Sequence, residues 1–176
     1  AVLAAWTENL VINGTLLTLY RRSLFERLIP FIQEAYARLS PAEDVDGSYE
    51  SSIEGAPSDK EGFQEAFHQR IRENSEEERM RGMTLIGPQR DDVRLTLDGR
   101  DIRNFGSQGQ QRTMVLAWKM AEMKAIEDYL GQVPILLLDD VMSELDEHRR
   151  AELLSFVDGR VQTFISSTTV EYFPDE

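Results

Sequence analysis

The stretch PILLLDD at residues 134–140 decides the fold class of this chain. A proline opens an apolar run without alternation, a pattern that predicts a parallel strand buried on both faces. The run stops at Asp139 and Asp140, which places both carboxylates at the carboxyl edge of a sheet, where α/β proteins bind ligands. Two acids there suit a magnesium–nucleotide site, with Asp139 holding the metal and Asp140 orienting a water or accepting its proton. The alternative is a core strand followed by an N-capping aspartate.

Length and composition limit the classes of protein to consider. The chain has 176 residues, of which 41% are hydrophobic, enough for a buried core in one moderate domain or one and a half small ones. The absence of cysteine excludes a disulfide framework and a zinc ribbon and suits a reducing cytosol. No apolar run approaches the ~20 residues of a membrane span, and no signal peptide is visible. The chain starts without methionine and inside a helical pattern, so we expect a start within a longer protein.

The charge is negative and unevenly distributed. A net charge of −13 argues against a freestanding nucleic-acid binder, because phosphate binding depends on Lys and Arg. Residues 42–61 hold seven acids and one base, with glycine, proline and serine between them, and are predicted to be a solvated, mobile linker. Basic residues cluster at Arg21–Arg22 and Arg70–Arg72. The overall negative charge therefore does not exclude a DNA-binding surface on another part of the protein.

The first 82 residues read as a helical arm subdomain that contains the acidic linker. Apolar residues at spacings of three and four predict one or two helices over 1–39, with a kink or break at Pro30. A further helix is predicted from Lys60 to about Arg81. Nothing in this half suggests chemistry.

Residues 83–176 change to an α/β pattern. The predicted elements are a short strand and turn at 83–88, a strand at 93–97 with a turn at Asp98–Gly99, a helix at 108–130, a strand at 134–139, a helix at 147–157 and a strand at 161–165. Strand, helix, strand order predicts a parallel sheet with flanking helices.

The sequence SQGQQ at residues 107–111 opens the long helix. Ser107 suits an N-cap, and Gln110 completes a capping box. Capping does not explain Gly109, because glycine is a poor helix former. A glycine there leaves backbone N–H groups uncovered at the positive end of the helix dipole, which is a place for an anion. We therefore expect this helix terminus to present the Ser107 hydroxyl and bare backbone amides to a phosphate.

Two polar segments follow the predicted strands. Ser143 to Asp146 is too polar to continue a strand, and its simplest interpretation is the capping turn of the next helix. Thr168 and Thr169 come after the last strand and would lie beside Asp140 if the two strands are neighbours. Their hydroxyls could then contact a water or a phosphate, although surface threonines are common.

The order SQGQQRT, ILLLDD, SELD and then a polar segment after a strand resembles the head of ABC-type ATPases. Within that superfamily it most resembles the RecF family of the SMC-like branch. Trp6 and Gly14 in the opening helix and GPQRDD at 87–92 also resemble that family, so the resemblance covers essentially the whole chain. It implies the C-terminal lobe of an ABC-type ATPase head at 83–176, with a mostly parallel sheet, plus the helical arm at 1–82.

The resemblance also implies roles for the matching residues. Ser107, Gly109 and Gln110 match the ABC signature motif, which in that superfamily binds the γ-phosphate of ATP held by the opposite subunit. Asp139 and Asp140 match Walker B, with Asp139 the Mg²⁺ ligand. Ser143 to Asp146 match the D-loop, which crosses the dimer interface.

Three positions depart from the wider ABC pattern, and one motif is missing. Gln108 replaces the usual glycine, Asp140 replaces glutamate, and Thr168 or Thr169 stands where a histidine switch is common; the resemblance then implies slow hydrolysis. No G-x-x-x-x-G-K-[ST] occurs in the chain, so the phosphate cradle called Walker A is missing. We expect the C-terminal portion of a longer protein, unable by itself to bind ATP tightly or hydrolyse it.

The function implied by the resemblance is recombinational DNA repair. In the intact protein, ATP and Mg²⁺ would drive formation of a homodimer that binds double-stranded DNA near gaps. The dimer would promote RecA loading with RecR and RecO in the bacterial cytoplasm, at the nucleoid, as part of DNA replication, recombination and the SOS response. One alternative is a non-catalytic partner-binding module of another SMC-like ATPase. Half of an ABC transporter ATPase fits less well, because no membrane-coupling element can be identified.

Overall fold

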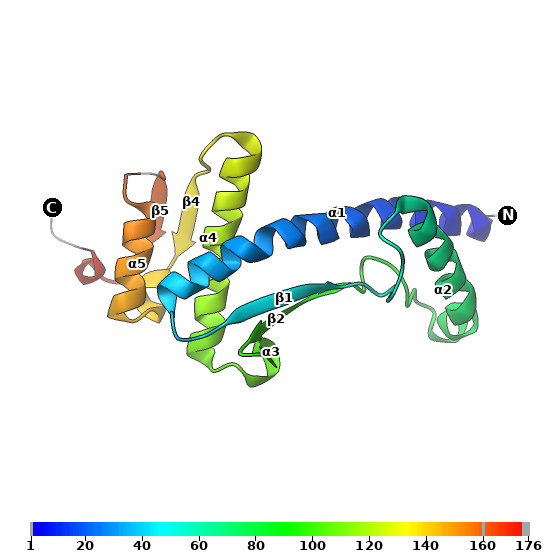
Figure 1. Ribbon diagram of the computed structural model, residues 1–176, viewed down its shortest axis with the longest axis horizontal. Coiled ribbons are helices and arrows are strands. Elements are labelled where there is room, and N and C mark those ends of the chain that lie inside the picture. The colour runs from blue at the N-terminus through cyan, green and yellow to red at the C-terminus, as the bar shows by residue number, and fades with distance from the viewer. Residues whose placement is uncertain (1, 160, 174–176) are drawn as a thin grey trace. The chain divides into compact units, whose positions relative to one another are not determined.

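The structure is a computed structural model that describes residues 2–159 and 161–173 (Figure 1). Its elements, in chain order, are α1 Val2–Leu39, β1 Val45–Glu50, α2 Lys60–Arg81, β2 Asp92–Leu97, β3 Arg100–Asp101, α3 Ile102–Phe105, α4 Gln108–Leu130, β4 Leu136–Asp139, the 3₁₀ helix η1 Val141–Glu144, α5 Glu147–Val157, β5 Thr163–Ser166 and the 3₁₀ helix η2 Val170–Tyr172. The helices expected at 60–81, 108–130 and 147–157 form with those bounds. None of the described helices is both long enough and apolar enough to cross a membrane.

The chain divides into two compact units that differ from the two predicted segments. One unit comprises the residues up to Glu26 together with Gly47–Arg94, and the other comprises Arg27–Asp46 together with the residues from Leu95 onward. The two predicted segments, 1–82 and 83–176, are each continuous in sequence. The observed division instead falls inside α1, β1 and β2, because each of these elements contributes residues to both units.

The first unit has a small core built on α1 and α2. Phe63 and Phe67 of α2 are fully buried, and their rings meet edge to face with centroids 6.4 Å apart. A Cβ at Gly14 of α1 would lie 2.7 Å from the Phe67 ring, so glycine permits this close packing. The core is completed by Val11, Ile53 and Ile86.

Asp91 ties together the segments of the first unit. Its carboxylate accepts hydrogen bonds from the Thr18 hydroxyl at 2.9 Å, the Tyr49 hydroxyl at 2.7 Å and the Ser52 amide at 2.8 Å. Burial and the hydrogen bond to Asp91 raise the pKa of Tyr49 to about 12. The GPQRDD sequence that contains Asp91 therefore has a structural role within this unit.

The strand expected at 83–88 does not form. In this segment the backbone makes hydrogen bonds with side chains instead of with a neighbouring strand. The Leu85 amide donates to Glu78 Oε1 at 2.7 Å, and the Gly87 amide donates to Ser52 Oγ at 3.0 Å. The turn that was also expected there is present, closed by the Arg90 amide on the Gly87 carbonyl at 2.8 Å.

The second unit contains the parallel strand pair β4 and β5, beside α4 and α5 (Figure 1). Leu136 and Leu138 point into the core, but Leu137 between them is 73% exposed, and Phe164 of β5 is 55% exposed. The predicted parallel pairing is therefore confirmed, whereas the predicted burial of the strand on both faces is wrong for this chain. The reason is that the pair has a packed layer on one face only among the described residues.

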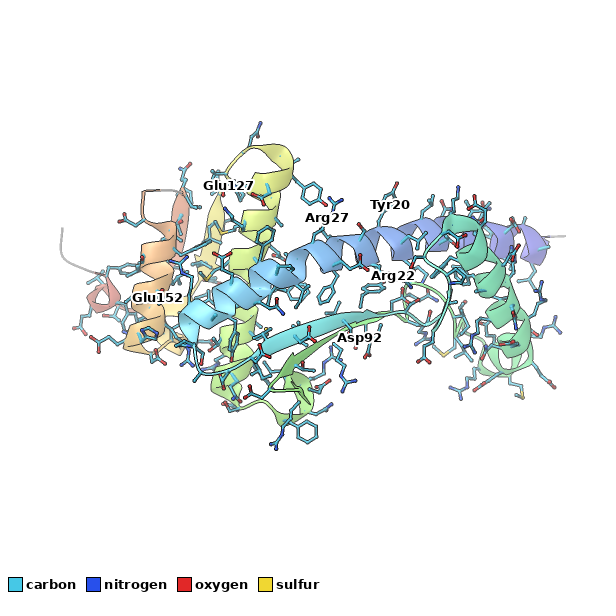
Figure 2. All side chains as sticks on the ribbon, in the orientation of Figure 1. Tyr20, Arg22, Arg27, Asp92, Glu127 and Glu152 are labelled. Atoms are coloured by element: carbon cyan, nitrogen blue, oxygen red, sulfur yellow. The ribbon has the colours of Figure 1, made fainter. Side chains whose placement is uncertain are left out.

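The C-terminal part of α1 packs into the core of the second unit. Its buried side chains recur at helical spacing: Leu28, Ile32, Ala35, Tyr36 and Leu39. Pro30 lies inside the helix, which continues to Leu39 without a break. Arg38 Nε lies 3.8 Å from Glu152 Oε2 of α5, which is labelled in Figure 2.

The acidic segment at 42–61 is more ordered than a solvated linker. Val45–Glu50 within it forms β1, which is the first strand of a three-stranded sheet with the order β1-β2-β3. Val45 and Ile53 are buried. The segment therefore contributes both backbone pairing and apolar side chains to the fold.

Candidate functional site

Asp139 and Asp140 stand at the carboxyl end of β4, as predicted from the sequence. The register of the parallel pair places Ser166, the last residue of β5, opposite Asp139. Ser166 Oγ donates to Asp139 Oδ1 at 2.5 Å and accepts a hydrogen bond from the Asp140 amide at 3.0 Å. One hydroxyl thus holds both aspartates, and both remain exposed to a ligand.

Asp140 has an unusual backbone conformation. Its φ of 48° and ψ of 23° lie in the left-handed region, which costs a non-glycine residue about 1–2 kcal/mol. The Ser166 contact on the Asp140 amide and the Ser143 hydroxyl, which donates to the Asp140 carbonyl at 2.9 Å, hold it there. Backbone strain of this kind gathers at functional sites because it turns a side chain in a direction that a relaxed backbone would not.

The carboxylates at this edge fit a magnesium ion that is bound mainly by its nucleotide. Within residues 2–159 and 161–173, no group of three or more His, Cys, Asp or Glu side chains could form a complete metal cage. Mg²⁺ usually needs only one or two carboxylates, because waters and substrate phosphates fill its other positions. Asp139 at the end of β4 meets that requirement.

The N-terminus of α4 has the predicted capping box. Ser107 Oγ accepts from the Gln110 amide at 3.2 Å, and Gln110 Oε1 accepts from the Ser107 amide at 2.7 Å. The amides of Gln108 and Gly109 have no partner within the helix, as in any first helical turn. A Cβ at Gly109 would meet only Ser107 Oγ, at 3.9 Å, so packing within the chain does not require glycine here. The turn therefore presents bare amides and a hydroxyl to solvent.

Glu43 fixes the Gln110 side chain and was missed by the sequence analysis. Gln110 Nε2 donates to Glu43 Oε1, while Glu43 Oε2 accepts from the hydroxyls of Tyr36 at 2.8 Å and Ser40 at 2.7 Å. Burial opposes ionisation of Glu43, but the hydrogen bonds from Gln110, Ser40 and Tyr36 outweigh it and lower its pKa. Burial, then the hydrogen bond to Glu43, raises the pKa of Tyr36.

The segment predicted to be a D-loop forms η1 and the N-cap of α5. Asp146 caps α5 by accepting from the Arg149 amide at 2.9 Å, and this hydrogen bond is the main cause of its lowered pKa. Arg112 Nε of α4 lies 3.5 Å from Glu144 Oε2 of η1. Gln108, Arg112 and Glu144 line one cavity of about 460 Å³, which places the start of α4 and this segment on two sides of the same opening.

Thr168 and Thr169 follow β5, which does neighbour β4 as the sequence analysis required. Thr168 is exposed, and Thr169 Oγ1 accepts from the Glu171 amide at 3.3 Å as the N-cap of η2. The residue of this region that contacts the aspartates is Ser166. Ser166 could have been found from the sequence as the first polar residue after the apolar run, had the strand register been known.

Comparison with solved structures and curated proteins identifies the class. No protein-family model matches the chain. A solved structure of the recombination mediator protein RecF with ATPrS, from the RecFOR pathway, aligns with a TM-score of 0.86 and 27% identity over 99% of this chain and 47% of that one. A RecF–ATP structure aligns with a TM-score of 0.83. The fold is therefore that of an α/β lobe of an ABC-type ATPase head with attached helices.

The curated relatives identify the family. The "DNA replication and repair protein RecF" of Rippkaea orientalis is 40% identical over 96% of this chain and 44% of its own length. Its counterpart from Halothermothrix orenii is 42% identical over 95% of this chain and 45% of its own length. The chain belongs to the RecF family, and it spans about half the length of the curated relatives it matches.

Proposed function

We propose that this chain supplies part of a composite ATP site in a RecF-type DNA-repair ATPase. The observation that carries the proposal is the aspartate pair at the end of β4, with Asp140 held in a left-handed conformation by Ser166 and Ser143. The exposed first turn of α4 provides a second group suited to phosphate. Neither group includes a phosphate-binding lysine loop, so the remaining part of the RecF polypeptide has to supply one.

Each group has a distinct role in this proposal. Asp139 holds Mg²⁺, and Asp140 orients the attacking water or accepts its proton. Thr168 or Thr169 contacts that water or the phosphate. Ser107, Gly109 and Gln110 bind the γ-phosphate of ATP carried by the opposite subunit, and Ser143 and Asp146 form the D-loop at the dimer interface. The short Asp140 side chain gives slow turnover.

The family membership supports a proposal for the activity of the whole protein. We propose an ATP-dependent homodimer that binds double-stranded DNA near gaps and promotes RecA loading with RecR and RecO, in the bacterial cytoplasm at the nucleoid. The support is the name of the curated relatives and the RecFOR pathway of the solved structures. The chain's own charge of −13 implies that much of the DNA-binding surface lies in the remaining part of the polypeptide.

A substitution at Ser107 tests the phosphate-binding role. Asp and Asn are both strong N-caps, so Ser107→Asp and Ser107→Asn begin α4 equally well and differ mainly in charge. The variants are mixed with the remaining part of a RecF polypeptide and Mg-ATP, and dimer formation is measured by sedimentation velocity. We expect Ser107→Asp to weaken ATP-dependent dimerisation by on the order of tenfold or more relative to Ser107→Asn, because the negative carboxylate would repel the γ-phosphate. Equal dimerisation of the two variants would show that this turn does not bind phosphate.

A further inference from the structure

Glu43 of the acidic segment contacts the first turn of α4 through the Gln110 side chain. Gln110 has one carboxamide, whose oxygen accepts from the Ser107 amide at 2.7 Å and whose nitrogen donates to Glu43. An ionised carboxylate only accepts hydrogen bonds, so Glu43 dictates which end of the carboxamide faces it. Glu43 thereby directs the oxygen of Gln110 toward Ser107, as the capping box requires.

Glu43 is itself held by the end of α1. Tyr36 and Ser40 both donate to Glu43 Oε2, at 2.8 Å and 2.7 Å, which leaves Oε1 to Gln110. Tyr36 is fully buried in the core of the second unit, and the Ser40 amide closes the helix on the Tyr36 carbonyl at 2.8 Å. The Glu43 carboxylate is therefore held by residues that are packed in the core or close the end of α1.

We propose that Glu43 is a positioning residue that fixes the phosphate-binding turn Ser107–Gln110 to the C-terminal end of α1. The inference rests on the proposed function of that turn. Through this contact, a displacement of the end of α1 reaches the Ser107 amide by three successive hydrogen bonds, by way of the Glu43 and Gln110 side chains. The position of the C-terminal end of α1 thus affects how well the turn Ser107–Gln110 can bind the phosphate of ATP.

The test uses substitutions at Glu43 and leaves the turn itself unchanged. Glu43→Ala removes the acceptor, whereas Glu43→Gln can present its amide oxygen to Gln110 and its NH₂ group to the oxygens of Tyr36 and Ser40. Asp44→Ala is the matched control, because Asp44 is an exposed acid beside Glu43 in the same segment. Solvent exchange of the Ser107 amide is measured by NMR on the chain itself, and ATP-dependent dimerisation is measured with the remaining part of a RecF polypeptide.

We expect Glu43→Ala to speed exchange of the Ser107 amide about fivefold, the factor for one ordinary hydrogen bond, and to weaken dimerisation. Glu43→Gln should keep the exchange rate of the Ser107 amide and the dimerisation close to those of the unchanged chain. Asp44→Ala should alter neither the exchange rate nor the dimerisation. Unchanged exchange in Glu43→Ala would overturn the inference at the level of geometry. Faster exchange with unchanged dimerisation would also overturn it, provided that Ser107→Asp still weakens dimerisation. If Ser107→Asp has no effect either, the proposed function of the turn fails, and the inference fails with it.

Discussion

Gly109 occupies the second position of α4, where nothing in the chain's own packing calls for a glycine. A Cβ at this position would make one ordinary contact, 3.9 Å from Ser107 Oγ, and would improve helix propensity. Close approach of a phosphate to the amides of the first turn, as proposed above, would account for the glycine.

Replacing Gly109 by alanine should separate stability from function. We expect Gly109→Ala to raise the free energy of unfolding by about 0.4–1 kcal/mol, measured by urea denaturation, because it restricts the unfolded chain. The same variant should weaken ATP-dependent dimerisation, because its methyl group occupies the approach to the amides. Ser155→Ala, on an exposed position of α5, is the control that alters helix propensity away from the site. A Gly109→Ala protein that is more stable and dimerises normally would contradict the phosphate role.

At the scale of single residues, motifs in the sequence predict the groups that we propose to carry the chemistry, but not the residues that contact those groups. Asp139, Asp140 and Ser107 were recognisable because their types and order form motifs. Glu43 and Ser166 were not, because their roles depend on contacts 67 and 27 residues distant in sequence, with Gln110 and Asp139. Such contacts follow from tertiary packing and strand register, which local patterns do not encode.

Among the elements, β4 shows that an apolar pattern can predict a strand correctly and still predict its burial wrongly. The run of leucines predicted a parallel strand, and β4 pairs with β5 in parallel. Leu137 is nevertheless 73% exposed, whereas Leu138 is 8% exposed. Among the described residues, the packed layer lies on the face of β4 that carries Leu136 and Leu138, so the apolar pattern predicted the strand but not the exposure of its other face.

The two faces of β4 should respond differently to the same substitution. We expect Leu138→Ala to lower the free energy of unfolding of the chain by about 2–5 kcal/mol, because it opens a cavity in the core. Leu137→Ala should change it by less than about 0.5 kcal/mol, because its side chain is already largely in water. Urea denaturation of the two variants measures the difference. Similar losses would mean that the outer face of β4 is covered in the chain by itself.

The helices were the most predictable elements and the connections the least. α2, α4 and α5 have the expected bounds because periodic apolar residues and capping residues mark them locally. The sequence predicts a strand at 83–88, yet the backbone there makes hydrogen bonds with the side chains of Glu78 and Ser52. Ile86 in this segment is nevertheless buried.

For the whole molecule, the chain spans about half the length of its curated RecF relatives, 44% in one case and 45% in another. Its two compact units do not follow the two halves of the sequence, since α1 begins in one unit and ends in the other. The proposed ATP site is also built from more than one part. In the proposed site, the aspartate pair and the turn at Ser107 belong to this chain, and we propose that the phosphate cradle lies in the part of a RecF polypeptide that the chain does not span.

The most direct test of the composite site is ATP hydrolysis by the purified chain, measured alone and after addition of the remaining part of a RecF polypeptide. We predict no turnover above background for the chain alone, because it has no phosphate-binding lysine loop. Slow turnover should appear when the two parts are mixed with Mg-ATP, together with ATP-dependent dimers in sedimentation velocity. Turnover by the chain alone at the rate of the mixture would contradict the composite site.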